Sequence, residues 1–372
     1  MNVPFFDATR EYLSYKEKID QAIFSVVSSG HFILGKQVFN FEEAIKYYTG
    51  AKYAIGVSNA SDALIIASNI LEFKNADVLT PAFSFFSSAS CILHSGGNPI
   101  FCDVCEDSFC IDISDAEKRI TKNTKGIIPV HLFLQTCDMS SCMNLAKKYN
   151  LKVLEDSAEA LGMHTTVDGT YHHAGNIGDF GVFSFFPTKT LGAYGDGGMI
   201  ITNNKELYEK AKSYRVHGAS SKYRYDYIGY NSRLDAIQAA ILKVKISYLD
   251  VLIKKRAKCA KQYRTLLSDI EEVELPKVNK GNKEVNYVFC LKVEKKRNDL
   301  INYLKNNGVE TCVYYPVPMH LQNCFKHLGF KEGDFPVAEN LSQKALSLPI
   351  FPGLTENEIS YVCEKISAFF EK

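Results

Sequence analysis

The chain has 372 residues, 46% of them hydrophobic, which is enough to bury sizeable cores and to form two domains. Its 43 Lys and Arg residues balance 42 Asp and Glu residues, so the net charge of +1 provides no general field to hold nucleic acid or an anionic membrane. No export-signal pattern is present, and no stretch approaches the roughly 18 apolar residues of a membrane span. We therefore expect a cytoplasmic protein with neither nucleic-acid nor membrane partners.

Short apolar runs alternate with helix-like segments between residues 50 and 205. Because these runs lack polar alternation, they are typical of strands buried on both faces of a mainly parallel sheet. Helices are expected over Ser61–Leu71 and Met139–Tyr149. The expected strands are Tyr53–Val57, Asp77–Thr80, Pro99–Cys102, Gly126–Val130, Lys152–Leu154, Gly181–Ser184 and Met199–Thr202.

The pattern changes in the last third of the chain. Residues 232–270 have helical periodicity with a Lys-rich outer face, and a turn-like stretch follows over 276–282. The sequence then predicts a strand at Tyr287–Val293, a helix at Arg297–Asn307, a strand at Val309–Tyr314 and a last helix at Thr355–Phe369. We predict a large α/β domain over residues 1–245, with an N-terminal helical segment, and a smaller α+β domain over 246–372.

Lys189 follows a predicted strand and precedes a glycine-rich turn. A lysine supplies the primary amine that bonds the aldehyde of pyridoxal phosphate, so such a lysine is the anchor that this cofactor requires. The apolar neighbours should strip water from the ammonium and lower its pKa. Taken alone, this stretch would also suit an exposed loop lysine. The neighbours are Phe185, Phe186, Pro187, Leu191 and Tyr194.

Asp156 ends an apolar strand. A buried carboxylate at that place suits the ring nitrogen of pyridoxal phosphate, which must keep its proton for the cofactor to accept electrons. The alternative role for Asp156 is a helix N-cap. Glu159 either completes a capping box with it or reaches the cofactor hydroxyl.

A phosphate site is expected where Val57 to Ser61 turns from a strand into an apolar helix, since helix N-termini bind phosphate. The Ala60 and Ser61 amides would form it, and Ser184 would add a hydroxyl. Each of these signals is common in α/β proteins.

Two rival interpretations concern glycines and cysteines. Gly192 to Gly198 resembles a dinucleotide-binding loop, but its glycines precede a strand instead of opening a helix. Cys102 and Cys105 have the spacing of zinc ligands, with Cys110 nearby, yet the sequence has no second cysteine pair of comparable spacing to complete a zinc site. The adjacent pair His172–His173 is expected to be exposed in a polar turn. We assign no metal site and expect the 11 cysteines to be reduced.

Taken together, these residues resemble the DegT/DnrJ/EryC1/StrS family of sugar aminotransferases, a branch of the fold type I pyridoxal phosphate enzymes with an aspartate aminotransferase-like α/β fold. The resemblance spans nearly the whole chain. The matching segments are Gly30–Gly35, Phe41–Glu42, Pro81–Phe85, Asp103, Thr124–His131, Glu155–Asp156, Ser184–Lys189, Gly229–Asp235, Tyr315–Pro316, His320–Gln322 and Leu346–Pro349.

The resemblance implies a role for each matching residue. Lys189 would bond the cofactor, Asp156 would hold its ring nitrogen, and Phe85 would stack on its ring. Asn231 would join the phosphate ligands Ala60, Ser61 and Ser184, reaching in from the neighbouring subunit of a homodimer with shared active sites. Tyr315 and His320 match positions near the sugar nucleotide, with packing between domains as their alternative role. Ala60–Ser61 stands where the family commonly has Gly–Thr, and Glu159 where many members have glutamine.

The implied activity is transfer of an amino group from L-glutamate to a nucleotide-linked keto sugar. The segment Lys189–Gly198 is more similar to the branch acting at C-3 of dTDP-3-oxo-6-deoxyhexoses, because the C-4 branch usually has Gly-Glu-Gly-Gly in the downstream turn. Amination at C-4 of a dTDP-, UDP- or GDP-linked sugar is the alternative. Two further classes are a dehydratase of the same fold, whose members replace the lysine with histidine, and a non-catalytic regulatory protein.

Overall fold

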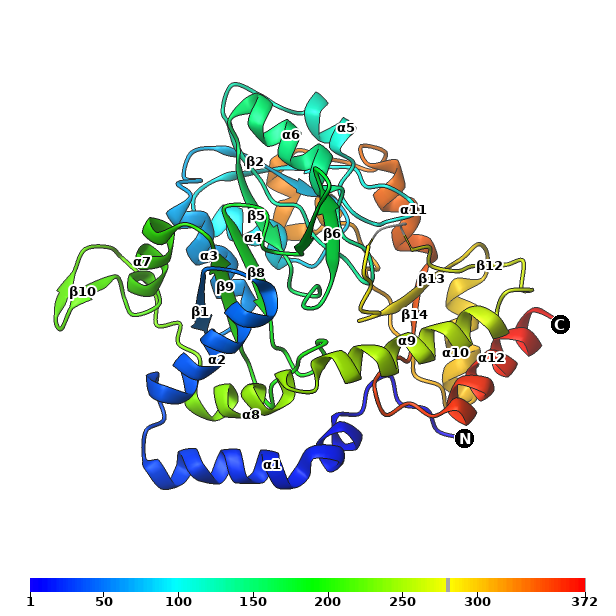
Figure 1. Ribbon diagram of the computed structural model, residues 1–372. Helices are drawn as coiled ribbons and strands as arrows, with labels where there is room; N and C mark the ends of the chain where they lie inside the picture. Colours follow the sequence, from blue (N-terminus) through cyan, green and yellow to red (C-terminus); the bar gives the residue numbers. More distant parts are fainter. Residues whose placement is uncertain (279–281, 372) are drawn as a thin grey trace.

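The computed structural model of the protein describes residues 1–278 and 282–371 (Figure 1). A seven-stranded sheet lies at its centre, with the strand order β1-β9-β8-β5-β4-β2-β3. Strand β9 runs antiparallel to β1 and β8, whereas the other neighbouring strands pair in parallel, so the sheet is mainly parallel, as predicted. The strands are β1 (Tyr53–Val57), β2 (Asp77–Pro81), β3 (Asn98–Cys102), β4 (Thr124–Ile127), β5 (Lys152–Asp156), β8 (Phe180–Ser184) and β9 (Gly198–Thr202).

Helices cover both faces of this sheet, which explains why its strands are apolar throughout. Successive side chains of a strand point to opposite faces. Ile55 and Ile200 therefore enter the core beneath one helical layer, while Ala54 and Ile201 enter the other. The first layer contains α3 (Ala60–Ile70), α4 (Ser87–His94) and α7 (Lys205–Tyr214), and the second contains α2 (Gly35–Thr49), α5 (Ile113–Lys118), α6 (Met139–Tyr149) and α8 (Ala236–Ile246).

The N-terminal helix α1 (Ala8–Ser29) lies along the outside of α8 (Figure 1). Asp7 caps its first turn by accepting the Thr9 N–H, and Gly30 ends it with a φ of +68°. A buried ion pair fixes the packing, because Lys245 Nζ lies 2.7 Å from Glu11 Oε1.

A second, smaller core lies in the C-terminal part of the chain. Its antiparallel sheet contains β12 (Val273–Glu274), β13 (Phe289–Val293) and β14 (Ala345–Leu348), and the long helix α9 (Leu249–Leu266) leads into it. Helices α10 (Arg297–Asn306) and α12 (Glu356–Phe370) pack beside this sheet (Figure 1). Val3 joins the same core and pairs with Val309, so the first residues of the chain lie with its last third. The predicted division at residue 245 stays a prediction.

Two predictions for this region were wrong in part. No strand forms over Val309–Tyr314; only isolated bridges from Val309 and Cys312 remain, and β14 occupies the place beside β13. Cys312 makes a single bridge to Ser347 of β14, and the next three residues line a cavity instead of extending this pairing. The helical region predicted over 232–270 is two helices, interrupted at Ser247–Tyr248. The turn-like stretch 276–282 includes residues outside the described ranges.

The remaining elements are short. His173 is buried in a hairpin, contrary to the exposed turn predicted for it: its Nε2 accepts the Gly162 N–H at 2.8 Å, and burial lowers its pKa to about 3. Within residues 1–278 and 282–371, no helix has the length and apolar character needed to cross a membrane, and no group of His, Cys, Asp and Glu is arranged to hold a metal ion. The remaining short elements of the fold are β6 (His164–Val167), β7 (Thr170–His173), β10 (Ala219–Ser221), β11 (Arg224–Tyr225), α11 (Pro336–Lys344) and the 3₁₀ turns Met319–Leu321 and Asn323–Leu328.

Candidate active site

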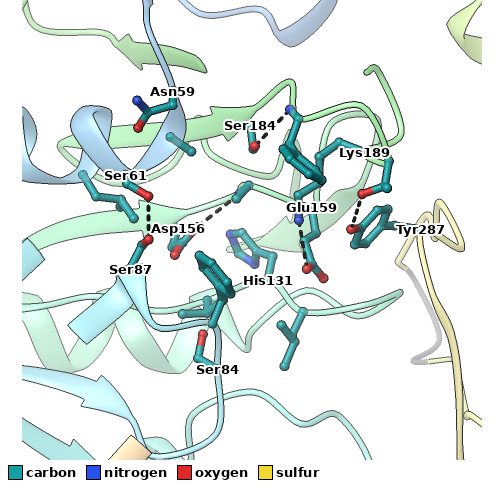
Figure 2. A pocket seen from close by; sticks show the side chains of 18 of the residues that line it. Asn59, Ser61, Ser84, Ser87, His131, Asp156, Glu159, Ser184, Lys189 and Tyr287 are labelled. Carbon is teal, nitrogen blue, oxygen red and sulfur yellow. Dashed lines mark hydrogen bonds and ion pairs between the residues drawn. The ribbon is translucent and has the colours of Figure 1, made fainter. Parts of the chain in front are cut away.

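A cavity of about 790 Å³ opens at the edge of the sheet where parallel strands end (Figure 2). Such an edge is the usual ligand position in an open α/β sheet, because the loops after neighbouring strands converge there. The C-terminal part of the chain closes one side through Tyr287 and residues 313–315. Eight of the residues predicted for the site line this cavity: Ala60, Ser61, Phe85, Asp156, Glu159, Ser184, Lys189 and Tyr315.

Lys189 lies in the turn after β8, where its backbone N–H donates to the Phe186 carbonyl at 2.8 Å. Its Nζ lies 3.1 Å from Glu159 Oε1 and 4.3 Å from the centre of the Tyr287 ring. Burial pushes the pKa of Lys189 down, but Glu159 and Tyr287 together outweigh burial and hold that pKa above its ordinary value. The sequence-based expectation of a lowered pKa was therefore wrong for the free amine, because it ignored the carboxylate that folding brings to it.

Asp156 ends β5 and is 4% exposed. Its Oδ2 accepts the Ser88 hydroxyl at 2.6 Å, and its Oδ1 accepts the Ala158 N–H at 3.2 Å. Burial raises the pKa of Asp156, and these two hydrogen bonds oppose that effect. A turn, not a helix, follows β5, so the helix-cap role and the capping box with Glu159 are both excluded.

A buried network holds the end of β5 in position. His131 Nε2 lies 3.0 Å from Glu155 Oε2, and His131 Nδ1 accepts the Cys137 N–H at 3.1 Å, so the ring proton is on Nε2. Glu155 also accepts backbone N–H groups from Gly175, Ile177 and Gly178. This carboxylate points away from the cavity and fixes the strand, which leaves the following Asp156 to face inward.

The turn from β1 into α3 forms the predicted anion site. Asn59 caps α3 by accepting the Asp62 N–H at 2.8 Å, which leaves the Ala60 and Ser61 amides at the open end of the helix. Figure 2 shows the Ser61 hydroxyl paired with that of Ser87 from α4, and the two oxygens are 2.6 Å apart. The site therefore offers amides and hydroxyls together to an anion.

Gly198 explains part of the glycine-rich turn after Lys189. A Cβ on Gly198 would lie 2.4 Å from the Asn59 carbonyl carbon and 2.8 Å from the Ala60 nitrogen. The glycine thus lets β9 approach the anion-binding turn closely, which is a different use from opening a helix in a dinucleotide fold.

Two predicted site residues lie outside the cavity. Asn231 is exposed and pairs with Val216. His320 is buried, with Nε2 3.0 Å from Glu339 Oε1 and its ring against Phe335. Its contacts with α11 match the packing role that the sequence left as the alternative, and a sugar contact for His320 stays a prediction.

Other residues of the site escaped sequence reasoning. Ser87 and Ser88 open α4, the helix that follows β2, and a serine pair at a helix start is a local signal that could have revealed them. Tyr287 and Tyr314 come from the distant C-terminal part, and no local pattern marks them.

A model of the DegT/DnrJ/EryC1/StrS aminotransferase family matches residues 14–367. The chain belongs to this family. A crystal structure of DesV from S. venezuelae, in complex with a ketimine intermediate, superposes with a TM-score of 0.95 at 32% identity, covering 100% of this chain and 99% of that one.

Three curated relatives cover nearly all of the sequence. A "pleiotropic regulatory protein" of Geobacillus stearothermophilus is 44% identical over 100% of this chain and 99% of its own. The dTDP-3-amino-3,6-dideoxy-α-D-galactopyranose transaminase of Aneurinibacillus thermoaerophilus is 37% identical over 99% of both. The UDP-N-acetyl-3-dehydro-α-D-glucosamine 3-aminotransferase of Acidithiobacillus ferrooxidans is 36% identical over 98% of this chain and 97% of its own.

The protein is thus a pyridoxal phosphate-dependent sugar aminotransferase. The residues of the cavity fit that cofactor: one amine, one buried carboxylate at the end of a strand, and an anion site at a helix N-terminus all face the same space. The predicted cofactor is therefore confirmed.

Proposed function

We propose that this enzyme moves the amino group of L-glutamate to C-3 of a nucleotide-linked 3-keto sugar. The most direct candidate is a dTDP-3-oxo-6-deoxyhexose, which would give a dTDP-Fuc3N- or dTDP-Qui3N-type product for surface glycan biosynthesis. One observation carries the choice of carbon: two relatives that align over nearly the whole chain are both named for amines at C-3.

Six of the residues that line the cavity have a task in this proposal. When bound, pyridoxal phosphate supplies an aldehyde that bonds amines and a ring that accepts the negative charge developing at the adjacent carbon. Asp156 would hold the proton on the ring nitrogen, and Phe85 would cover the ring. The Ala60 and Ser61 amides with the Ser184 hydroxyl would bind the phosphate. Lys189 would bond the cofactor between turnovers and move a proton once glutamate displaces it.

A UDP-linked 3-keto sugar is the second candidate, because the 36% identical relative is named for that nucleotide. Amination at C-4 remains the alternative carbon. Amination at C-3 and amination at C-4 would differ only in how the sugar is oriented toward the amine that attacks it. All three candidate substrates would therefore require the same cofactor-binding residues.

A purely regulatory role is the remaining rival, since the 44% identical relative carries a regulatory name. Against it, the cavity retains Lys189, Asp156 and the anion site. The lysine also argues against a dehydratase, whose members carry histidine there.

The decisive experiment is a substrate panel. Purified enzyme with L-glutamate should convert dTDP-linked 3-keto-6-deoxyhexoses to amino sugars faster than UDP-linked 3-keto sugars and any 4-keto sugar. Mass spectrometry and NMR of the product identify the carbon that carries nitrogen. Amination only at C-4 contradicts the proposed carbon, and no amination of any member, with the cofactor bound, favours the regulatory role.

We also propose a homodimer in which Asn231 completes the partner's phosphate site. Asn231 is exposed and outside the cavity of its own chain. Large apolar side chains stand in solvent on α1 and α2 and beside Asn231, with Tyr47 93% and Ile228 96% exposed, as is typical of surfaces that pair. Light scattering should give twice the 41.7 kDa chain mass, and Asn231→Ala should weaken binding of the cofactor. A monomer with normal cofactor affinity would contradict this arrangement.

A further inference from the structure

The free amine of Lys189 already has a binding place in the folded chain (Figure 2). On one side lies Glu159 Oε1, 3.1 Å from Nζ, and on the other lies the Tyr287 ring, 4.3 Å away. An ammonium prefers both partners, a carboxylate through charge and an aromatic face through its quadrupole. These two contacts hold the amine between Glu159 and Tyr287 at the wall of the cavity.

Both partners are held by other contacts, so neither depends on the lysine for its place. Glu159 Oε2 accepts the Phe133 N–H at 2.9 Å. Tyr287 is 7% exposed, and its hydroxyl lies 3.1 Å from the Thr188 hydroxyl, next to the lysine in sequence. The two partners come from distant parts of the chain, one from the loop after β5 and the other from the segment before β13.

We propose that Glu159 and Tyr287 form a holding site that receives the Lys189 ammonium whenever this amine is not bonded to the cofactor. Every transamination cycle contains such a state, because the cofactor leaves the lysine when it carries the amino group. The inference rests on the role proposed above for Lys189. Glu159 and Tyr287 are positioning residues in this account, since they act through the lysine.

The holding site has a cost and a benefit for catalysis. An amine must lose its proton before it attacks a carbonyl, and a carboxylate neighbour keeps that proton in place. Held as an ammonium, Lys189 would not attack the bound sugar or cofactor, because a protonated amine has no free electron pair. Removing Glu159 should therefore make the free amine reactive at lower pH.

Other titratable groups also face this space, and the test must separate them from the pair. Asp156 interacts electrostatically with Lys189 from β5, and Asp196 lines the cavity from the glycine-rich turn. His131, Tyr314 and Tyr315 line it as well. Glu159 and Tyr287 raise the pKa of Lys189 more than these groups do, so the pair should dominate the proton affinity of the amine.

The experiment measures the reactivity of Lys189 in the holoenzyme saturated with pyridoxamine phosphate, the form that leaves the lysine free. Trace labelling with acetic anhydride across pH, followed by mass spectrometry of the Lys189 peptide, gives the pH of half-maximal labelling. Glu159→Gln should lower that pH by about 1 to 3 units. Tyr287→Leu should lower it by roughly half a unit to one unit, and Tyr287→Phe, which keeps the ring, by less.

Glu117→Gln is the matched control, because Glu117 forms an ion pair with Lys148 on the surface at 2.7 Å. It should leave the Lys189 profile unchanged. The holding site is refuted if Glu159→Gln leaves that profile where it was in a protein of native circular dichroism. Should Glu159→Gln not fold, an unchanged profile in Tyr287→Leu refutes it instead. If Lys189 labels equally fast in the pyridoxal phosphate form, the role proposed for Lys189 itself is wrong.

Discussion

Lys189→Ala should abolish amino transfer, lowering turnover by about 10⁴-fold or more, while the protein stays folded. The substitution removes both the amine that bonds the cofactor and the group that moves the proton. Its effect on folding should be small, because Glu159 keeps its hydrogen bond from the Phe133 N–H. Glutamate-dependent formation of amino sugar, measured by mass spectrometry, gives the activity.

Two additional measurements make this prediction specific. The native holoenzyme should have a visible colour that borohydride bleaches, and this colour should be absent or altered in Lys189→Ala. Lys148→Ala, at a lysine whose side chain is 63% exposed, should retain full activity. Measurable turnover by Lys189→Ala at more than about one hundredth of the native rate would place the reacting amine elsewhere.

Asp156→Asn should lower the turnover rate by about 10²- to 10³-fold, the range observed when one charge-stabilising group is lost. Asparagine has almost the same shape and can still accept from Ser88 or Ala158, but it carries no negative charge. The ring nitrogen of the cofactor would then lose its counter-ion, and its proton with it. Stopped-flow absorbance of the glutamate half-reaction measures the affected step directly.

A matched substitution distinguishes charge from local folding. Asp138 caps α6 by accepting the Ser141 N–H at 3.0 Å, outside the cavity lining, so Asp138→Asn should leave the rate unchanged. Near-normal rates in Asp156→Asn would instead mean that Asp156 has only a structural role, through its hydrogen bonds with Ser88 and Ala158. Thermal unfolding of both variants shows whether either substitution disturbs the fold.

Local sequence was sufficient for the central sheet and for much of the cavity. Apolar runs such as Tyr53–Val57 predicted strands covered on both faces, and the structure covers them with helices. Asp156 and Ser61 could be predicted because Asp156 ends one buried strand and Ser61 lies in the first turn of the helix after another, and the ligand-binding edge of the sheet is found at such places. The resemblance added Phe85 and Tyr315, which no local rule would have selected.

The same local reasoning failed where a partner comes from far along the chain. Val309–Tyr314 has the composition of a strand, yet it makes only isolated bridges, from Val309 to Val3 and from Cys312 to Ser347, and Tyr314 lines the cavity. His320 packs against Glu339 of α11, a contact that no local pattern marks. Both arrangements depend on segments that a single window of sequence does not contain.

The sequence by itself determined the type of sheet, the amine and the carboxylate of the site, because strand burial and the residues that follow each strand are local properties. Tertiary structure alone decided what surrounds Lys189. Its apolar neighbours in sequence predicted a lowered pKa, whereas folding places Glu159 and Tyr287 against the ammonium and holds the pKa above its ordinary value. The physical reason is that electrostatic energy depends on distance in space, and these partners lie about 30 and 100 residues away along the chain.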